Sequence, residues 1–190
     1  MPEAIAIKCL RCGTKNRIPQ GKTGSASKCG RCGNPLHQTE NPAVMLTLRC
    51  SQCRVKNRVP SDKLMSGPKC GRCGEPLQTK DVQSGQAVMV TDKNFDQTVL
   101  ASPLPVLLYS WAPWCSVCSS TGPMVDQLAM DTKGKIRVGK LDTQSNPNLA
   151  AKYNILSVPS FFIFDGGRLK RHIPGAAAKH DLMMQMAKYI

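Results

Sequence analysis

The pattern of apolar and polar residues changes character near residue 87. Beyond it, short apolar runs of strand type alternate with segments whose apolar residues recur at helical spacing. The expected elements are strand 87–90, helix 91–100, strand 105–111, helix 115–130, strand 135–142, helix 146–154, strands 160–164 and 168–173, and helix 176–189. This order predicts an α/β domain over residues 86–190, with a mixed sheet and helices on both faces.

Two local signals refine this prediction. Asn146 followed by Pro147 is typical of a helix start, with the asparagine as N-cap and the proline in the first turn. The tripeptide at 165–167, Asp-Gly-Gly, is typical of a tight hairpin turn between two antiparallel strands. Segments 38–44 and 78–86 have the largely polar composition of linkers.

The stretch 1–80 contains a duplication instead of an alternating pattern. KNRIP at 15–19 returns as KNRVP at 56–60, and KCGRCG at 28–33 returns at 69–74. Four C-x-x-C pairs repeat at one constant offset: Cys9, Cys12, Cys29 and Cys32 return as Cys50, Cys53, Cys70 and Cys73. We therefore divide this part into module 1, residues 1–40, and module 2, residues 41–82.

Each module has the cysteine spacing of a tetrahedral zinc site with four thiolate ligands. Two cysteines of a C-x-x-C pair can share one tight turn with both sulfurs facing the same ion, and a second turn completes the four ligands. All aromatic residues of the chain lie beyond residue 90, so the modules can bury little apolar surface. They therefore need a bound metal ion to fold. We expect one Zn²⁺ in each module and no organic cofactor. An iron–sulfur centre or disulfides are the alternatives.

The chain is strongly basic, with 26 Lys and Arg against 12 Asp and Glu. The stretch 1–80 holds 15 of these basic and 4 of the acidic side chains, an excess found in nucleic-acid-binding proteins. No aromatic side chain is present there to stack on bases, and many cations adjoin cysteines whose thiolates they can offset. Nucleic acid is therefore not the expected partner.

Membrane insertion and secretion are also not expected. A membrane-spanning helix needs an apolar run of about 18 residues or more, and the sequence contains none. Its start shows no apolar signal region with a small-residue cleavage site. We therefore expect a cytoplasmic protein. That compartment disfavours disulfides within the modules.

A fifth pair, Cys115 and Cys118, opens the expected helix 115–130. Its position places Cys115 at a helix N-terminus, where the helix dipole and free N–H groups favour a thiolate. Such a thiolate can attack a disulfide, and Cys118, one turn further, can displace the captured partner and close an internal disulfide. Two structural thiols, or half of a third metal site, are the alternatives.

Residues 86–190 resemble the thioredoxin family. The resemblance rests on WAPWCSVC at 111–118, on Pro123, on the stretch from Lys140 to Phe164 that contains SVPSFFIF, and on Gly175. Module 1, with NRIP and KCGRCG, resembles the N-terminal zinc ribbon of the zinc-containing thioredoxins, and this chain holds it twice. The resemblance implies a thioredoxin fold and a thiol–disulfide oxidoreductase that acts on protein disulfides, with a thioredoxin reductase as a partner.

The resemblance also implies roles for individual residues. Cys115 would be the nucleophile, Cys118 the resolving cysteine and Pro159 a cis-proline beside them. A cis-proline leaves the preceding N–H and carbonyl free to pair with an extended substrate and denies a metal ion access to the sulfurs. The expected substrate-binding residues are Trp111, Trp114, Val158 and Gly175, together with Pro159.

Two departures from the family pattern affect the expected chemistry of the pair. Ser116 and Val117 replace the usual Gly-Pro between the cysteines, which predicts a reduction potential less negative than the roughly −270 mV of thioredoxin. Ser119 and Ser120 replace larger, often basic residues, which predicts weaker docking of a reductase.

A third departure concerns proton transfer. Tyr109 occupies the place of the family's buried aspartate, and a phenol with an ordinary pKa of about 10 is a poor proton acceptor near neutral pH. Lys140 matches the lysine that accompanies that aspartate and is expected to lack a carboxylate partner here. Lys140 is then either a solvated strand lysine or a partly buried amine that takes the proton from Cys118.

The sequence therefore predicts a thiol–disulfide oxidoreductase with two zinc ribbons ahead of a thioredoxin-fold domain. A second hypothesis is a zinc-dependent protein-interaction or holdase-like protein whose thioredoxin fold is only weakly active. A third combines the two, with oxidant-driven release of zinc exposing the ribbons.

Overall fold

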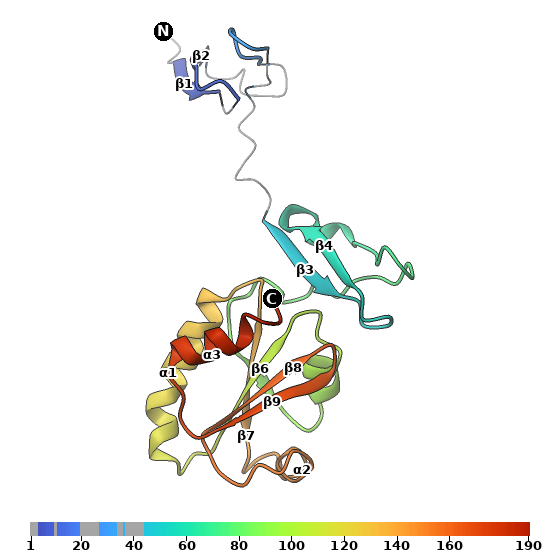
Figure 1. Cartoon of the computed structure of the whole chain (residues 1–190), viewed down its shortest axis with the longest axis vertical. Coiled ribbons are helices and arrows are strands. Elements are labelled where there is room, and N and C mark those ends of the chain that lie inside the picture. The colour runs from blue at the N-terminus through green and yellow to red at the C-terminus, as the bar shows by residue number, and fades with distance from the viewer. Residues whose placement is uncertain (1–3, 10, 20–26, 34–35, 37–43) are drawn as a thin grey trace. The chain divides into compact units, whose positions relative to one another are not determined.

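The computed structural model describes residues 4–9, 11–19, 27–33, 36 and 44–190 (Figure 1). The chain divides into two compact units, residues 1–44 and residues 45–190. The first unit holds module 1. The second holds module 2 together with the C-terminal domain, residues 86–190.

Each module is built on a two-stranded antiparallel hairpin with a cysteine turn at its tip. In module 1, β1 (Ala4–Lys8) pairs with β2 (Lys15–Pro19). In module 2, β3 (Met45–Arg49) pairs with β4 (Lys56–Pro60), and the 3-10 helix η1 (Ser61–Ser66) follows. Equivalent positions of the repeat pair with each other in both hairpins, so the duplication seen in the sequence is also a structural one.

The C-terminal domain is built on a five-stranded mixed sheet in the order β5-β7-β6-β8-β9. Strand β7 runs parallel to both of its neighbours, while β8 runs antiparallel to β6 and to β9. The strands are β5 (Val88–Val90), β6 (Val106–Trp111), β7 (Arg137–Asp142), β8 (Ser160–Asp165) and β9 (Arg168–Pro174). The predicted α/β domain with a mixed sheet is confirmed.

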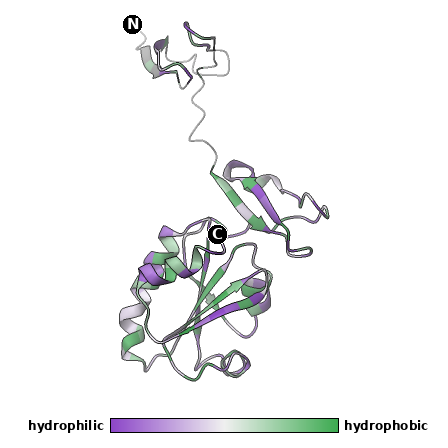
Figure 2. Ribbon diagram, in the orientation of Figure 1, coloured by the Kyte–Doolittle hydropathy of each residue, from purple (hydrophilic) through white to green (hydrophobic). Residues whose placement is uncertain are grey.

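Helices cover both faces of this sheet. Helices α1 (Ser116–Asp131) and α3 (Lys179–Met186) pack on one face, where they share a core with Leu107 and Tyr109 of β6 and Phe161 of β8. The helix α2 (Pro147–Lys152) and the π-helix η2 (Asp96–Leu100) share a core with alternate residues of the same strands on the other face. The inner strands β6 and β8 are apolar and the edge strand β9 is polar, as Figure 2 shows.

Two local expectations are corrected. The expected helix over 91–100 consists of turns followed by the π-helix η2, and at its start the Asn94 side chain accepts from the Thr91 N–H and donates to the Met89 carbonyl. Asn146 precedes α2 without capping it, since its side chain accepts from the Asp92 N–H and donates to the Asp142 carbonyl. The cap comes from the distant Asp92 instead, which accepts from the N–H of Leu149.

The segment 78–86 connects module 2 to the C-terminal domain and is not a loose linker. Val82 is 2% exposed and belongs to the apolar cluster of module 2. The guanidinium of Arg137 donates to the Lys80 carbonyl and to the Thr98 carbonyl, which ties the segment to η2 and β7. The other expected linker lies outside the described residues except for Val44.

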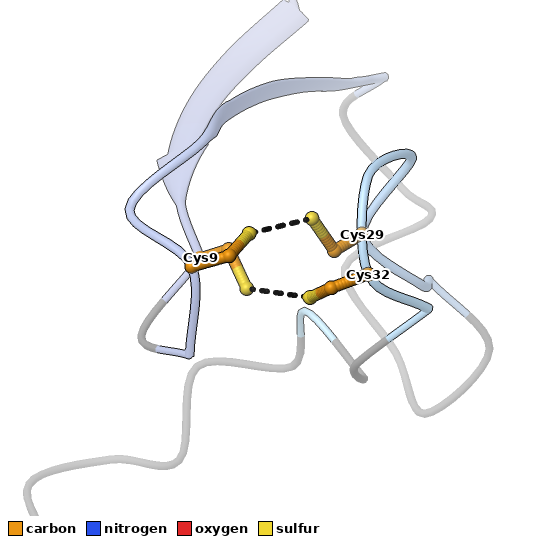
Figure 3. A group of neighbouring side chains, drawn as sticks. Cys9, Cys29 and Cys32 are labelled. Atoms are coloured by element: carbon orange, nitrogen blue, oxygen red, sulfur yellow. Dashed lines mark hydrogen bonds between the residues drawn. The ribbon is translucent and has the colours of Figure 1, made fainter.

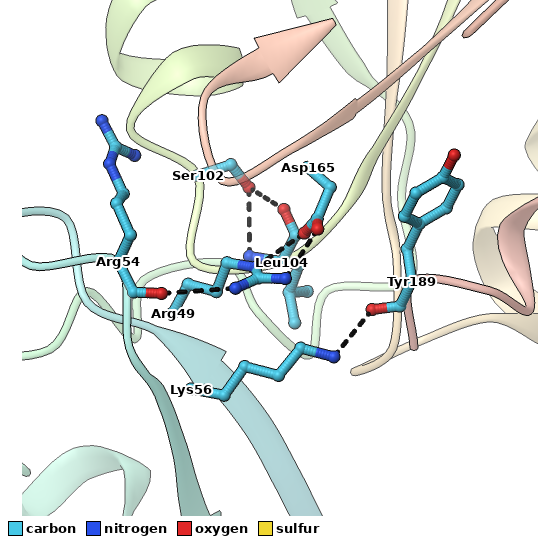
Figure 4. Close-up of polar contacts among 7 residues, drawn as sticks. All are labelled: Arg49, Arg54, Lys56, Ser102, Leu104, Asp165 and Tyr189. Atoms are coloured by element: carbon cyan, nitrogen blue, oxygen red, sulfur yellow. Dashed lines mark hydrogen bonds and ion pairs between the residues drawn. The ribbon is translucent and has the colours of Figure 1, made fainter. Parts of the chain in front are cut away.

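Module 2 packs against the C-terminal domain through an apolar cluster and a set of polar contacts (Figure 4). Leu104, just ahead of β6, is buried in the same cluster as Leu46 and Leu48 of β3. Arg49 donates through Nε and Nη2 to the two carboxylate oxygens of Asp165, each at 2.6 Å, where β8 ends. This bidentate pair holds the hairpin of module 2 at the β8–β9 turn.

Candidate functional sites

The cysteines of each module form one compact cage. In module 1 the sulfurs of Cys9 and Cys32, and those of Cys12 and Cys29, lie 3.6 Å apart (Figure 3). The corresponding pairs of module 2 are also 3.6 Å apart, and all four sulfurs of each cage lie within 4.8 Å of one another. The sequence expectation that each module holds its own four ligands agrees with this grouping.

The cages fit a single tetrahedral ion. In a tetrahedron with Zn–S bonds of about 2.3 Å, neighbouring sulfurs are about 3.8 Å apart, close to the observed spacing. A disulfide requires sulfurs about 2.05 Å apart, so the eight cysteines are not joined by disulfides in this arrangement. The donor set and the spacing both suit Zn²⁺.

An asparagine supports each cage, and the sequence analysis did not single it out. The Asn16 side chain donates to the Thr14 carbonyl and to the sulfur of Cys29, and accepts from the N–H of Gly30. Asn57 makes the same three kinds of contact in module 2. The signal was present, because both asparagines belong to the repeated K-N-R-x-P stretch. Such outer contacts orient metal ligands.

Backbone N–H groups of the second cysteine turn stabilise a thiolate in each cage. The N–H of Arg31, with that of Cys32, lowers the pKa of Cys29 to about 6. In module 2 the N–H of Cys73 lowers the pKa of Cys70 to about 6, against the opposing effect of burial. A metal-binding cysteine must be deprotonated, so these turns prepare one ligand of each cage for a cation.

The fifth cysteine pair lies where β6 leads into α1. Cys115 is the N-cap of α1, and its sulfur accepts from the backbone N–H of Cys118 at 3.1 Å. The two cysteines form a disulfide, with their Cα atoms 5.2 Å apart. Cys115 is 9% exposed and Cys118 is 4% exposed, so Cys115 is the more accessible member of the pair. The pair sits at a helix N-terminus, as expected.

The loop before β8 faces this pair. The Val158–Pro159 peptide bond is cis, and the Val158 carbonyl oxygen lies 3.7 Å from the sulfur of Cys115. Gly175 follows the last residue of β9, which pairs with Ser160, so register brings it beside Pro159. Gly175 has a φ of +80° and open space where a side chain would be, which leaves this edge of the site uncovered.

The two tryptophans have different surroundings. Trp114, in the turn before Cys115, is 72% exposed. Trp111 ends β6 and packs against the core cluster that contains both cysteines, and its buried Nε1 has no hydrogen-bond partner among the described residues. Val158 packs against the same cluster. The structure thus gathers Trp111, Val158, Pro159 and Gly175 around the cysteines, with Trp114 at the surface next to them.

Tyr109 and Lys140 lie beside Cys118. The Tyr109 hydroxyl donates to the Cys118 carbonyl at 3.0 Å, and burial raises the pKa of Tyr109 to about 12. Lys140 does have a carboxylate partner, contrary to expectation: its Nζ lies 2.5 Å from Oδ1 of Asp126 on α1. The sequence alone does not show this pair, because Asp126 and Lys140 meet only when α1 packs against β7.

Comparison with known proteins agrees with the fold and the site. Residues 86–188 match the thioredoxin family, and residues 8–34 and 49–75 each match the family described as "Thioredoxin 2, N-terminal", a zinc ribbon. Within the described part of the chain, no helix is long and apolar enough to cross a membrane.

Three similar proteins illustrate the match, which covers only the C-terminal domain. "Thioredoxin 1" of Nostoc sp. is 42% identical over 104 residues, which cover 55% of this chain and 97% of that protein. "Thioredoxin" of Synechocystis sp. is 43% identical over 101 residues, 53% of this chain and 94% of that protein. "Thioredoxin M-type, chloroplastic" of Zea mays is 42% identical over 105 residues, 55% of this chain and 63% of that protein.

A C-x-x-C pair at the N-terminus of α1, on a mixed five-stranded sheet, defines a thiol–disulfide oxidoreductase. The chain belongs to the thioredoxin family and carries two copies of the N-terminal zinc ribbon of thioredoxin 2.

Proposed function

We propose that the protein exchanges disulfides with protein substrates through Cys115 and Cys118. In the reduced protein, the Cys115 thiolate attacks a substrate disulfide and forms a mixed disulfide, releasing one substrate thiolate. The Cys118 sulfur then attacks Cys115, closes the internal disulfide and releases the second substrate thiol. Substrate is reduced by two electrons, and the protein is left in the disulfide form that the structure contains.

The observation that carries this proposal is the position of Cys115 as the N-cap of α1. Its sulfur already accepts the N–H of Cys118, and a negative charge there interacts with the positive end of the helix dipole. Both effects favour the thiolate, which is the attacking species.

The surroundings of Cys115 suit an extended polypeptide. The Val158 carbonyl oxygen lies 3.7 Å from the Cys115 sulfur, so a substrate segment that forms strand-like hydrogen bonds with this loop can bring its disulfide to Cys115. We assign Trp111, Trp114, Val158, Pro159 and Gly175 to this substrate-binding surface. The exposed face of Trp114 supplies apolar contact area, and the open space at Gly175 admits substrate backbone.

The eight cysteines of the modules would hold two zinc ions, one per module. Zinc bound by four thiolates has no open position, so its contribution is to fold the module and not to take part in the exchange. The proposed domain limits are 1–40 and 41–82 for the zinc ribbons and 86–190 for the thioredoxin domain. We place the protein in the cytoplasm, with a thioredoxin reductase as a partner.

Two cysteine variants test the proposal. Cys115→Ser is expected to abolish the reduction of insulin disulfides by the zinc-loaded protein. Cys118→Ser is expected to stop turnover while trapping a mixed disulfide on Cys115, which mass spectrometry detects. Full insulin reduction by Cys115→Ser would contradict the proposal, and retained binding of unfolded clients without any exchange would favour a holdase-like protein.

The residues between the cysteines affect the reduction potential of the pair. Ser116 and Val117 leave the start of α1 without the proline that stiffens it in relatives, and we expect a reduction potential less negative than about −270 mV. Equilibration of the zinc-loaded protein with glutathione redox buffers measures it. An equal or more negative potential would contradict this part of the proposal.

A further inference from the structure

A cavity of about 340 Å³ adjoins the cysteine pair on the α1 face of the sheet. One wall is a row across three strands: Met89 of β5, Lys140 of β7 and Tyr109 of β6 are neighbours in register. The opposite wall comes from α1 and contains Cys118, Ser119, Gly122, Pro123 and Asp126. One water needs about 10–15 Å³ of such volume, so the cavity has room for several waters next to Cys118.

Resolution of a mixed disulfide requires Cys118 to lose its proton, and few groups around the cavity can receive it. The titratable groups that line it are Tyr109 from β6, Lys140 from β7, and Cys115, Cys118 and Asp126 from α1 and its N-cap, while β5 contributes only Met89. Tyr109 stays protonated, because burial raises its pKa to about 12 and its hydroxyl donates to the Cys118 carbonyl.

The ion pair at the other end of the cavity contains the acceptor. Lys140 is paired as an ammonium, which has three donor hydrogens and no acceptor site. The Asp126 carboxylate has more lone pairs than one lysine fills, so it can also accept from water in the cavity. Asp126 is 52% exposed and Lys140 is 18% exposed, so the carboxylate reaches bulk solvent while the lysine anchors it at the cavity.

We propose that Asp126 is the proton acceptor for Cys118, through cavity water, and that Lys140 is the residue that positions it. The inference rests on the exchange reaction proposed above. Cys118 gives its proton to a water, which passes one to Asp126. The Cys118 sulfur bonds to the Cys115 sulfur, and the bond from Cys115 to the substrate sulfur breaks. The electron pair leaves with the substrate sulfur, which takes a proton from solvent, and Asp126 returns its proton to bulk water.

Rapid acid quenching tests this assignment on the reduced, zinc-loaded full-length protein. The protein is mixed with excess bis(2-hydroxyethyl) disulfide, and mass spectrometry of the active-site peptide follows the mixed disulfide on Cys115 as it rises and decays. The decay rate is the resolution step. With Asp126→Asn we expect it to slow about tenfold at pH 7, below the range of directly placed general bases because a water intervenes. The deficit should vanish at high pH, where hydroxide ionises Cys118.

Matched variants separate this role from a structural one. Asp131→Asn removes another carboxylate of α1 that pairs with a lysine, Lys179, but that does not line the cavity, and it should leave resolution unchanged. Asp126→Glu should restore most of the rate at pH 7.

Two results would overturn the assignment. Faster resolution in Asp126→Asn would mean that the carboxylate only repels the Cys118 thiolate, and an equal slowing at every pH would mean a structural role. A wild-type protein that never forms the mixed disulfide on Cys115 would instead contradict the proposed exchange reaction.

Discussion

Modules 1 and 2 each have a four-cysteine cage of the same geometry, but they differ in the residues around the cage. Both have sulfur pairs 3.6 Å apart and an asparagine, Asn16 or Asn57, that contacts a ligand sulfur. The bidentate partner of Asp165, however, is Arg49, and the equivalent position of module 1 is Lys8. The duplication has thus kept the residues that a tetrahedral ion requires, while module 2 has residues that dock it on the C-terminal domain.

Arg54 shows the difference most clearly. The residue after the second cysteine of a pair is glycine at positions 13, 33 and 74, each with a positive φ, and it is arginine only at position 54. Arg54 keeps the left-handed backbone, with a φ of +61°, which is unfavourable for a residue with a side chain. This arginine makes a contact that glycine could not make, because its guanidinium donates to the Leu100 carbonyl at 2.8 Å. The contact between module 2 and the C-terminal domain therefore offsets the unfavourable φ at Arg54.

The largest expected contrast comes from breaking one cage at a time. Cys70→Ala should leave module 2 unfolded, uncovering Leu104 and removing the partner of Asp165, and we expect the melting temperature of the C-terminal domain to fall by about 5–10 °C. The matched variant Cys29→Ala should also cost one zinc ion but leave that transition in place, because module 1 belongs to the other compact unit. Calorimetry with zinc quantification measures both, and equal shifts would contradict the distinction.

The next effect concerns the bidentate pair alone. Arg49→Met removes the partner of Asp165, whose side chain is 10% exposed. We expect the free energy of unfolding to fall by about 2–3 kcal/mol, which is below the range for fully buried ion pairs. Lys8→Met is the control in module 1 and should change the stability of the C-terminal domain by less than about 0.5 kcal/mol. Urea unfolding followed by the fluorescence of the two tryptophans reports on that domain. Equal stability of Arg49→Met and wild type would show that the contact does not dock module 2.

Substitution of Asn16 or Asn57 tests whether the two cages depend on the same hydrogen bond to a ligand sulfur. Asn16→Ala and Asn57→Ala each remove a hydrogen bond to a ligand sulfur, and we expect zinc affinity to fall by about 10–100-fold at the altered site. Competition with a chromogenic chelator measures the affinity of each site. A large loss in one module with none in the other would show that the two cages are not equivalent.

The smallest expected effect is a difference in stability between two variants of Arg54. It separates the cost of the unfavourable φ from the loss of the contact with Leu100. Arg54→Ala loses the contact with Leu100 and keeps the unfavourable φ, whereas Arg54→Gly loses the same contact and relieves the backbone. The glycine variant should therefore be more stable than the alanine variant by about 1 kcal/mol. Chemical denaturation of the two variants side by side gives the difference, and a more stable alanine variant would show that this turn stores no strain.

Local patterns in the sequence were sufficient for most of the fold. The alternation of elements, the hairpin at 165–167 and the four-cysteine sets each depend on residues close together or on a visible repeat. The cap of α2 could not be found this way, because Asp92 is far along the chain from the N–H of Leu149 from which it accepts. The apolar spacing over 91–100 predicted a regular helix but does not show that its second half winds as the π-helix η2.

The candidate sites divide in the same way. Cys115 was expected at a helix N-terminus because a strand pattern and a helix pattern meet there. Asp126 and the Arg49–Asp165 pair were missed, since each becomes visible only when separate elements pack together. Lys140 was expected to lack a carboxylate partner because Tyr109 replaces the family's aspartate, but Asp126 of α1 supplies one.

The proposed chemistry depends on the Cys115 sulfur of the reduced protein being an accessible thiolate at neutral pH. The rate of its alkylation by iodoacetamide, followed by mass spectrometry from pH 5 to pH 10 in the zinc-loaded protein, tests this directly. We predict a rate that is already close to its plateau at pH 7, because the N-terminus of α1 stabilises the charge. A rate that is low at pH 7 and rises only near about pH 8.5, as for an ordinary cysteine, would contradict this prediction.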